Sequence, residues 1–156
     1  MDTVYKKVEI TKTGLASLKA ELSVLKDVKR PKAVDRLANA RSQGDLAENS
    51  DYHNAKDELE FIDGRISELE DVLERSVVVA GGGKSDAVSV GTQVVLKVSG
   101  KEHAFSIVGE WEADPAQKKI SHTSPLGQAL VGRKVGDKVE VEAPAGKVIY
   151  EILSIE

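Results

Sequence analysis

Three acidic side chains mark the stretch of this chain that could do chemistry. Asp45 follows the turn-forming Gly44, Glu48 stands three residues later, and Asp51 three residues after that. The Asp-x-x-Glu spacing is typical of a capping box, in which the two side chains accept from amides at the start of a helix. The spacing taken alone favours this capping interpretation. Carboxylates can also be magnesium ligands, although two exposed carboxylates hold the ion poorly by themselves.

As a metal site, Asp45 and Glu48 would need a partner. Magnesium keeps several waters and usually takes phosphate oxygens from a substrate in addition to one or two carboxylates. In a two-metal phosphoryl site, this pair could hold a weakly bound second ion and orient the attacking water. Nearby, Arg41 and Lys56 could steady a phosphate backbone or simply face solvent. Tyr52 could stack on a base or pack as the first residue of a helical seam.

Two long helical patterns flank these residues and must position them. We expect helices over about 13–43 and about 48–76, and a kink at Arg30-Pro31, because proline lacks the amide donor that a helix needs. Neither helix can bury its apolar stripe alone, so the two patterns predict an antiparallel coiled-coil hairpin with the acidic residues at its tip. The stripes contain Leu15, Leu18, Leu22, Leu25, Val34, Leu37 and Arg41 in the first helix, and Tyr52, Ala55, Leu59, Ile62, Ile66, Leu69, Leu73 and Ser76 in the second.

The charges on the two arms predict how the helices align. Basic residues gather on the first arm and acidic residues on the second, as expected for flanking ion pairs that fix the register of a coiled coil. A turn near Asp45 sets Arg36 opposite Asp57 and Arg30 opposite Asp63.

The pattern changes from helix to strand after residue 76. We expect residues 1–78 to form the coiled-coil domain, with its acidic tip near 44–51, and residues 79–156 to form a second, α+β domain. Residues 81–86 have the composition of a flexible linker. Alternating patterns predict one hairpin over 92–98 and 102–108 and another over 138–142 and 147–153, with a short helix over 126–131 between them.

Composition narrows the class of protein. The chain has 156 residues, a formal net charge of −4 and no cysteine, which excludes disulfides and thiolate metal sites. Neither half is basic enough to bind nucleic acid through its charge alone. Because no apolar run approaches a membrane span or a secretory signal, we expect a cytoplasmic protein with no membrane partner.

The tip motif Gly44-Asp-Leu-Ala-Glu-Asn-Ser-Asp-Tyr-His53 within a helical hairpin resembles the bacterial transcript-cleavage factors of the GreA/GreB family. Nearly the whole chain follows the order of that family's motifs, and the small basic patch is closer to the GreA kind. Further matching segments are Val28-Lys-Arg-Pro31, Ala40-Arg41, Ile107-Val-Gly109, Glu112-Ala-Asp114, Ser124-Pro-Leu126, Ala129-Leu130 and the hairpin from Ala143. Departures are Ala47 in place of a frequent basic residue, Lys56 in place of arginine and Ala145 in place of glycine.

The resemblance implies a function, a fold and a set of residues. It implies a monomer that binds RNA polymerase at a rim coiled coil, enters the secondary channel and stimulates cleavage of backtracked nascent RNA without being an enzyme itself. It further implies an FKBP-like fold for the C-terminal domain. The implied roles are catalysis and joint binding of Mg²⁺ with the polymerase for Asp45 and Glu48, RNA contact for Arg41 and Lys56, tip contacts for Asn49, Asp51 and Tyr52, and polymerase docking for Asp114, Ser121, Ser124, Pro125 and Leu126.

Two other functions remain open at this stage. A channel-binding protein of the same shape could inhibit the polymerase without cleaving RNA, although the Gly-Asp-Leu-x-Glu-Asn pattern favours cleavage. Alternatively, the α+β domain could be an FKBP-like prolyl isomerase or chaperone. The few aromatic residues after residue 61, namely Phe105, Trp111 and Tyr150, argue against an aromatic-lined isomerase pocket.

Overall fold

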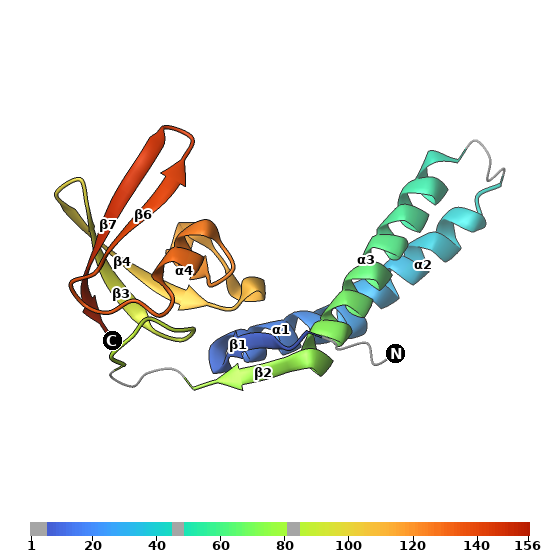
Figure 1. Cartoon of the computed structure of the whole chain (residues 1–156). Helices are drawn as coiled ribbons and strands as arrows, with labels where there is room; N and C mark the ends of the chain where they lie inside the picture. Colours follow the sequence, from blue (N-terminus) through green and yellow to red (C-terminus); the bar gives the residue numbers. More distant parts are fainter. Residues whose placement is uncertain (1–5, 45–48, 81–84) are drawn as a thin grey trace, which may run out of the picture. The chain divides into compact units, whose positions relative to one another are not determined.

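The computed structural model describes residues 6–44, 49–80 and 85–156. These residues fold into two compact units, shown in Figure 1. The hairpin unit is Ala16–Arg75, and the sheet unit combines Met1–Leu15 with Ser76–Glu156. No helix in the described part of the chain is both long enough and apolar enough to cross a membrane.

The first arm of the hairpin is helical on both sides of the predicted kink. It consists of α1 (Lys12–Val24), a π-helical segment η1 (Leu25–Lys29) and α2 (Arg30–Arg41). Within η1, the amide of Arg30 donates to the carbonyl of Leu25, five residues back. Pro31, which has no amide donor, therefore follows a segment whose backbone hydrogen bonds already span five residues instead of four. The helix continues through Pro31, as predicted.

The π-helical segment changes which residues form the seam. Leu18, Leu25, Ala33 and Ala40 are buried, so their spacing is seven, then eight, then seven. A π-helical turn holds one more residue than an α-helical turn, and it absorbs the extra residue between Leu25 and Ala33. The predicted seam positions Val34 and Arg41 are therefore wrong by one residue: both are exposed.

The second arm is the single helix α3 (Ser50–Arg75), which packs beside α2 in Figure 1. Its seam is largely as predicted, except that Val72 is buried where Leu73 was expected and Leu73 is only half-buried. Near the ends where the arms are joined, the buried residues are alanines, which let two helices approach closely. Farther along α3 they are larger: Ile62, Ile66, Leu69 and Val72.

Ion pairs flank this seam. Arg30 Nε lies 2.7 Å from Asp63 Oδ1, which confirms that predicted pair. Arg36 instead pairs with Glu58 and Asp51, so its predicted partner, Asp57, is wrong. The long side chain of Arg36 thus reaches two carboxylates of α3 on either side of the position that the sequence predicted.

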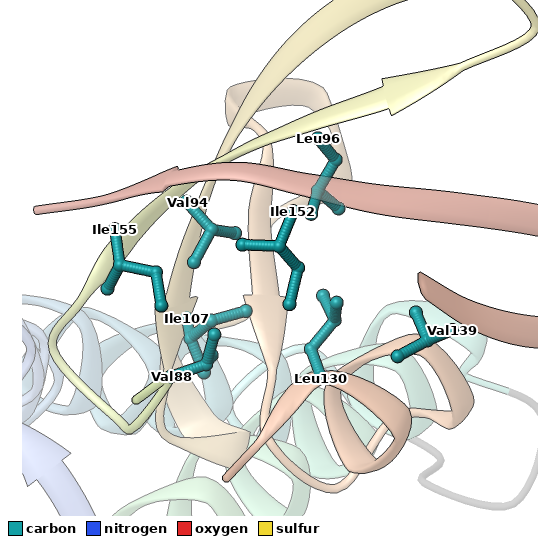
Figure 2. Close-up of a cluster of buried hydrophobic side chains, with 8 residues drawn as sticks. All are labelled: Val88, Val94, Leu96, Ile107, Leu130, Val139, Ile152 and Ile155. Atoms are coloured by element: carbon teal, nitrogen blue, oxygen red, sulfur yellow. The ribbon is translucent and has the colours of Figure 1, made fainter. Parts of the chain in front are cut away.

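The sheet unit contains the predicted strands. Strands β3 (Gln93–Val98), β4 (Lys101–Val108), β5 (Lys119–Ser121), β6 (Lys138–Ala143) and β7 (Gly146–Ile155) form a mixed sheet in the order β5-β4-β3-β7-β6. The helix α4 (Pro125–Leu130) packs against this sheet, and Figure 2 shows Leu130 facing the buried side chains of the strands. The core consists of Val88, Val94, Leu96, Ile107, Leu130, Val139, Ile152 and Ile155.

A second, two-stranded sheet pairs β1 (Val8–Thr11) in parallel with β2 (Ser76–Val79). The predicted switch from helix to strand after residue 76 is confirmed by β2. The α+β class and the N-terminal helical hairpin are likewise confirmed.

Glu112 ties the start of α1 to the sheet unit. It lies in the short 3₁₀ turn η2 (Glu110–Glu112) and accepts hydrogen bonds from the amides of Thr11, at 2.9 Å, and Gly109, at 3.0 Å. Thr11 caps α1 through its hydroxyl, which accepts from the amide of Gly14 at 3.1 Å. A Cβ on Gly14 would lie 2.0 Å from Glu112 Cδ, so only glycine lets this carboxylate approach the helix.

The position of the seam can be tested with neighbouring substitutions in α2. Ala33 is 2% exposed and Val34 is 39% exposed. We expect Ala33→Leu to lower the free energy of unfolding by about 1–3 kcal/mol, because the larger side chain overpacks a filled seam. Val34→Leu should change it by less than about 0.5 kcal/mol. Urea denaturation followed by circular dichroism measures both, and a larger loss for Val34→Leu would contradict the observed register.

Candidate functional site

The structure describes the residues on both sides of the predicted tip, up to Gly44 and from Asn49. Arg41, at the end of α2, and Asn49, Asp51, Tyr52 and Lys56, at the start of α3, belong to the described residues. Asp45 and Glu48, the predicted catalytic and metal-binding pair, lie outside them. The geometry on either side nevertheless shows which residues the hairpin uses to hold its own helix ends.

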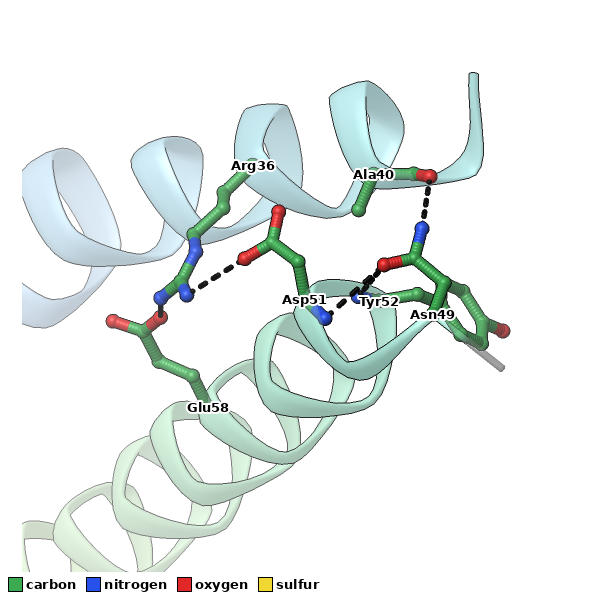
Figure 3. Close-up of polar contacts among 6 residues, drawn as sticks. All are labelled: Arg36, Ala40, Asn49, Asp51, Tyr52 and Glu58. Carbon is green, nitrogen blue, oxygen red and sulfur yellow. Dashed lines mark hydrogen bonds and ion pairs between the residues drawn. The ribbon is translucent and has the colours of Figure 1, made fainter. Parts of the chain in front are cut away.

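Asn49 connects the two helix ends, as Figure 3 shows. Its side-chain oxygen accepts from the amides of Asp51, at 3.1 Å, and Tyr52, at 3.2 Å, which makes it the N-cap of α3. Its side-chain nitrogen donates to the carbonyl of Ala40 in the last turn of α2, at 2.9 Å. One asparagine thus satisfies donors of one helix and an acceptor of the other.

This cap bears on the capping-box interpretation of Asp45 and Glu48. Helix α3 begins at Ser50, after both carboxylates, and Asn49 accepts from the amides of its second and third residues. The start of α3 therefore does not depend on a capping box at Asp45. The sequence contains a signal for the actual cap, because asparagine directly before a helical pattern is among the preferred N-cap residues.

Arg36 of α2 pairs with both Asp51 and Glu58, which lie about two turns apart on α3 (Figure 3). Its guanidinium nitrogens lie 3.0 Å from Asp51 Oδ1 and 2.8 Å from Glu58 Oε2. The hydrogen bond to Asp51, followed by the one to Glu58, raises the pKa of Arg36 above its ordinary value. Asp51 is therefore engaged with the first arm, and its predicted contact with a partner would have to compete with this ion pair.

Arg41 and Tyr52 meet across the tip. The guanidinium carbon of Arg41 lies 5.9 Å from the centroid of the Tyr52 ring, within the range of a cation–π interaction. The ring is half-buried and makes an edge contact with His53, whereas Arg41 and Lys56 are exposed. Within the described residues neither cation forms an ion pair, so the hairpin presents two positive charges near its free end. Such charges attract phosphate groups.

The chemistry of the donors limits what metal this region could bind. No cluster of three or more histidine, aspartate or glutamate side chains able to hold a metal occurs in the ranges 6–44, 49–80 and 85–156. Asp51, the third acidic residue of the motif, faces Arg36. The remaining carboxylates of the motif are those of Asp45 and Glu48, and a pair of carboxylates suits a magnesium ion whose other ligands come from a partner.

Comparison with known proteins identifies the family. The profile described as "Transcription elongation factor, N-terminal" (GreA_GreB_N) matches residues 8–78, and that described as "Transcription elongation factor, GreA/GreB, C-term" matches residues 83–156. The chain belongs to the GreA/GreB family of transcription elongation factors. The resemblance drawn from the tip motif is thereby confirmed.

Individual GreA/GreB relatives match over nearly their full length. Transcription elongation factor GreA of Hyphomonas neptunium is 46% identical, with 96% of this chain and 97% of the relative covered. The GreA of Clostridium acetobutylicum is 45% identical, with 97% and 98% covered. Among solved structures, GreA factor homolog 1 of Thermus thermophilus is 30% identical, with 97% and 99% covered and a TM-score of 0.46.

The residues that the GreA/GreB resemblance assigns to docking lie close together in the sheet unit. Ser121 ends β5, Ser124 caps α4, and Pro125 and Leu126 begin that helix. Asp114 caps the 3₁₀ turn η3 (Pro115–Gln117) and forms a backbone bridge to Lys119, the first residue of β5.

Most of these docking residues also have a role inside the fold. Ser121 is buried, and its carbonyl accepts from the hydroxyl of Ser124 at 2.7 Å. The same hydroxyl of Ser124 accepts from the amide of Gly127 at 3.0 Å, and Leu126 packs against the core. Pro125 is the exposed member of the group. A docking partner would therefore meet Pro125 at the start of α4, where Ser121 and Ser124 hold the turn that precedes the helix.

The role of Asn49 in joining the helix ends can be tested by substitution. We expect Asn49→Ala to lower the free energy of unfolding by about 1–2 kcal/mol, because α3 loses its cap and the bond to Ala40. The amides of Asp51 and Tyr52 should also exchange faster with solvent. Asn54→Ala is the control, since Asn54 is exposed inside the same helix. An equal effect of the two variants on stability and exchange would contradict the role of Asn49.

Proposed function

We propose that this chain stimulates the intrinsic RNA-cleavage activity of RNA polymerase. The hairpin enters the secondary channel of the polymerase and brings Asp45 and Glu48 to its active site, where backtracked RNA is cut. The chain is a factor that completes a site in its partner, and is not an enzyme itself. This proposal deepens the family assignment, which makes the chain a transcription elongation factor.

The observation that carries the proposal is that residues other than the acidic pair stabilise the helix ends near the tip. Asn49 caps α3, and Arg36 holds Asp51 and Glu58 against the first arm. The described ends of both helices are thus stabilised by residues other than Asp45 and Glu48. We assign those two carboxylates to a site in the partner, because magnesium usually takes one or two carboxylates together with phosphate oxygens of a substrate.

The length of the hairpin supports delivery over a distance. Helix α3 contains 26 residues, and at roughly 1.5 Å per residue it spans about 39 Å. A helix this long can carry residues at one end well into a channel while its other end stays outside. The ion pairs and the buried seam along α2 and α3 make the pair stiff enough to hold the tip in place.

Each residue at the tip then has a chemical role. Asp45 and Glu48 would hold a magnesium ion jointly with the polymerase, and such an ion supplies an activated water and stabilises charge on the phosphate. Arg41 and Lys56 attract the phosphates of the extruded RNA and keep it near the carboxylates. Tyr52, with Arg41 against its ring, offers a stacking surface for a base.

Docking of the sheet unit would keep the tip in place. The surface that includes Pro125 contacts the rim coiled coil of the polymerase, and Asp114, Ser121, Ser124 and Leu126 maintain that surface. An isomerase function is less well supported: Phe105 and Tyr150 pack against the core cluster of the sheet unit. Rings used in this way are poorly placed to line a substrate pocket.

Substitution of the acidic pair tests the proposal. We expect Asp45→Ala or Glu48→Ala to lower stimulated RNA release from a backtracked complex by about a hundredfold or more, because the water loses its activating ligand set. Binding to the polymerase should stay within about twofold of the wild type, since the docking surface is unchanged. Asp57→Ala is the control, an exposed acidic position of α3. Full cleavage by either tip variant would contradict the assignment, and intact transcripts with the wild type would instead indicate an inhibitor.

A further inference from the structure

The outer face of α3 carries an aromatic side chain that the hairpin does not use. Phe61 is 75% exposed, whereas the other exposed apolar side chains of the hairpin unit, Val24, Val28 and Val34, are 39–46% exposed. It directly precedes Ile62, which is buried in the seam, but its own side chain faces solvent. A phenylalanine this exposed leaves apolar surface in contact with water.

Gly64 lies one turn farther along the same face. Its backbone has ordinary helical geometry, and a Cβ at this position would meet no described atom within 4 Å. Neither close packing nor backbone conformation within the hairpin therefore requires glycine here. Glycine is the least favourable residue in a helix interior after proline, so its presence in α3 works against the stability of the helix. The space that it leaves open faces outward.

Phe61 and Gly64 form part of a shallow depression. It is lined by Glu60, Phe61, Gly64, Arg65 and Glu68, which we call the Phe61–Gly64 surface. The guanidinium of Arg65 lies 2.8 Å from Glu21 Oε1 and 2.8 Å from Glu68 Oε2, so its charge is balanced within the hairpin. Glu60 has no cation partner among the described residues, and the surface as a whole is negative.

These features determine the kind of partner that fits. The carboxylates repel a phosphate backbone, which disfavours nucleic acid. They attract a cation, and an arginine or lysine side chain gains further by stacking over an aromatic ring. The missing side chain at Gly64 allows another backbone to come close. An aromatic residue beside a glycine and between carboxylates therefore suits a basic protein segment.

We propose that the Phe61–Gly64 surface docks a basic segment of RNA polymerase, with an arginine or lysine of that segment over the Phe61 ring. This inference rests on the proposed function and names a contact for the side of the hairpin, separate from the tip and from the surface around Pro125. In this inference, the outer face of α3 helps to hold the hairpin inside the polymerase.

Binding of labelled chain to core RNA polymerase, measured by fluorescence anisotropy, tests the inference. We expect Phe61→Ala to weaken binding by about tenfold or more, as for an aromatic anchor at an interface. Gly64→Gln should raise the melting temperature of the chain, because glutamine is the better helix former, and yet weaken binding by blocking the close approach. A Gly64→Gln chain that is more stable but binds more weakly would show that Gly64 acts in docking and not in folding. Val34→Ala, on the other arm, is the matched control and should bind like the wild type.

Charge reversal identifies the class of partner. Glu60→Lys should weaken binding, most strongly at low salt, if the surface meets a basic protein segment. Stronger binding by Glu60→Lys would indicate a phosphate backbone and overturn the inference. The inference would also be overturned if Phe61→Ala and Gly64→Gln bound the polymerase as tightly as a wild-type chain that both binds and stimulates RNA cleavage. A wild type that binds but leaves RNA intact would refute the proposed cleavage function alone, because the binding comparison would still stand.

Discussion

The structure of the hairpin depends on the antiparallel seam between its two arms. The buried residues of the first arm recur at spacings of seven, eight and seven. The π-helical segment Leu25–Lys29 absorbs the extra residue, so that Ala33 and Ala40 stay in line with Leu18 and Leu25. Everything else on the hairpin follows from this register. It sets Arg30 against Asp63 and Arg36 against Glu58, and it brings the last turn of α2 within reach of Asn49.

The register also separates structural residues from available ones. On the inside, alanines let the helices approach and Asn49 joins their ends. Outside the seam, Arg41 and Lys56 remain near the tip and Phe61 and Gly64 remain on the flank, exposed to solvent. A transcription elongation factor built in this way can offer different chemistry at its end and along its side, because Lys56, Phe61 and Gly64 are exposed and lie outside the buried seam.

Periodicity alone predicts most of this fold, since amphipathic spacing and turn residues specify the hairpin, the strands and the short helix α4. It misplaces Val34 and Arg41, because one extra residue in a π-helical turn leaves no mark in the spacing of leucines. The acidic motif predicts the chemistry of the tip. The sequence of the motif does not reveal that Asn49 joins two helices, because that role depends on a bond to the carbonyl of Ala40 on the other arm. Nor does the sequence around Ser121 reveal that this polar side chain is buried, because burial depends on how β5 and α4 pack.

The central claim is that Asp45 and Glu48 complete a magnesium site in the polymerase. The most direct test measures RNA release from a backtracked complex against Mg²⁺ concentration, with the polymerase saturated by the chain. The wild type should lower the Mg²⁺ concentration needed for half-maximal cleavage relative to polymerase alone, and Glu48→Gln should cancel this shift at equal occupancy. The same half-maximal Mg²⁺ concentration with and without the wild-type chain would contradict the claim.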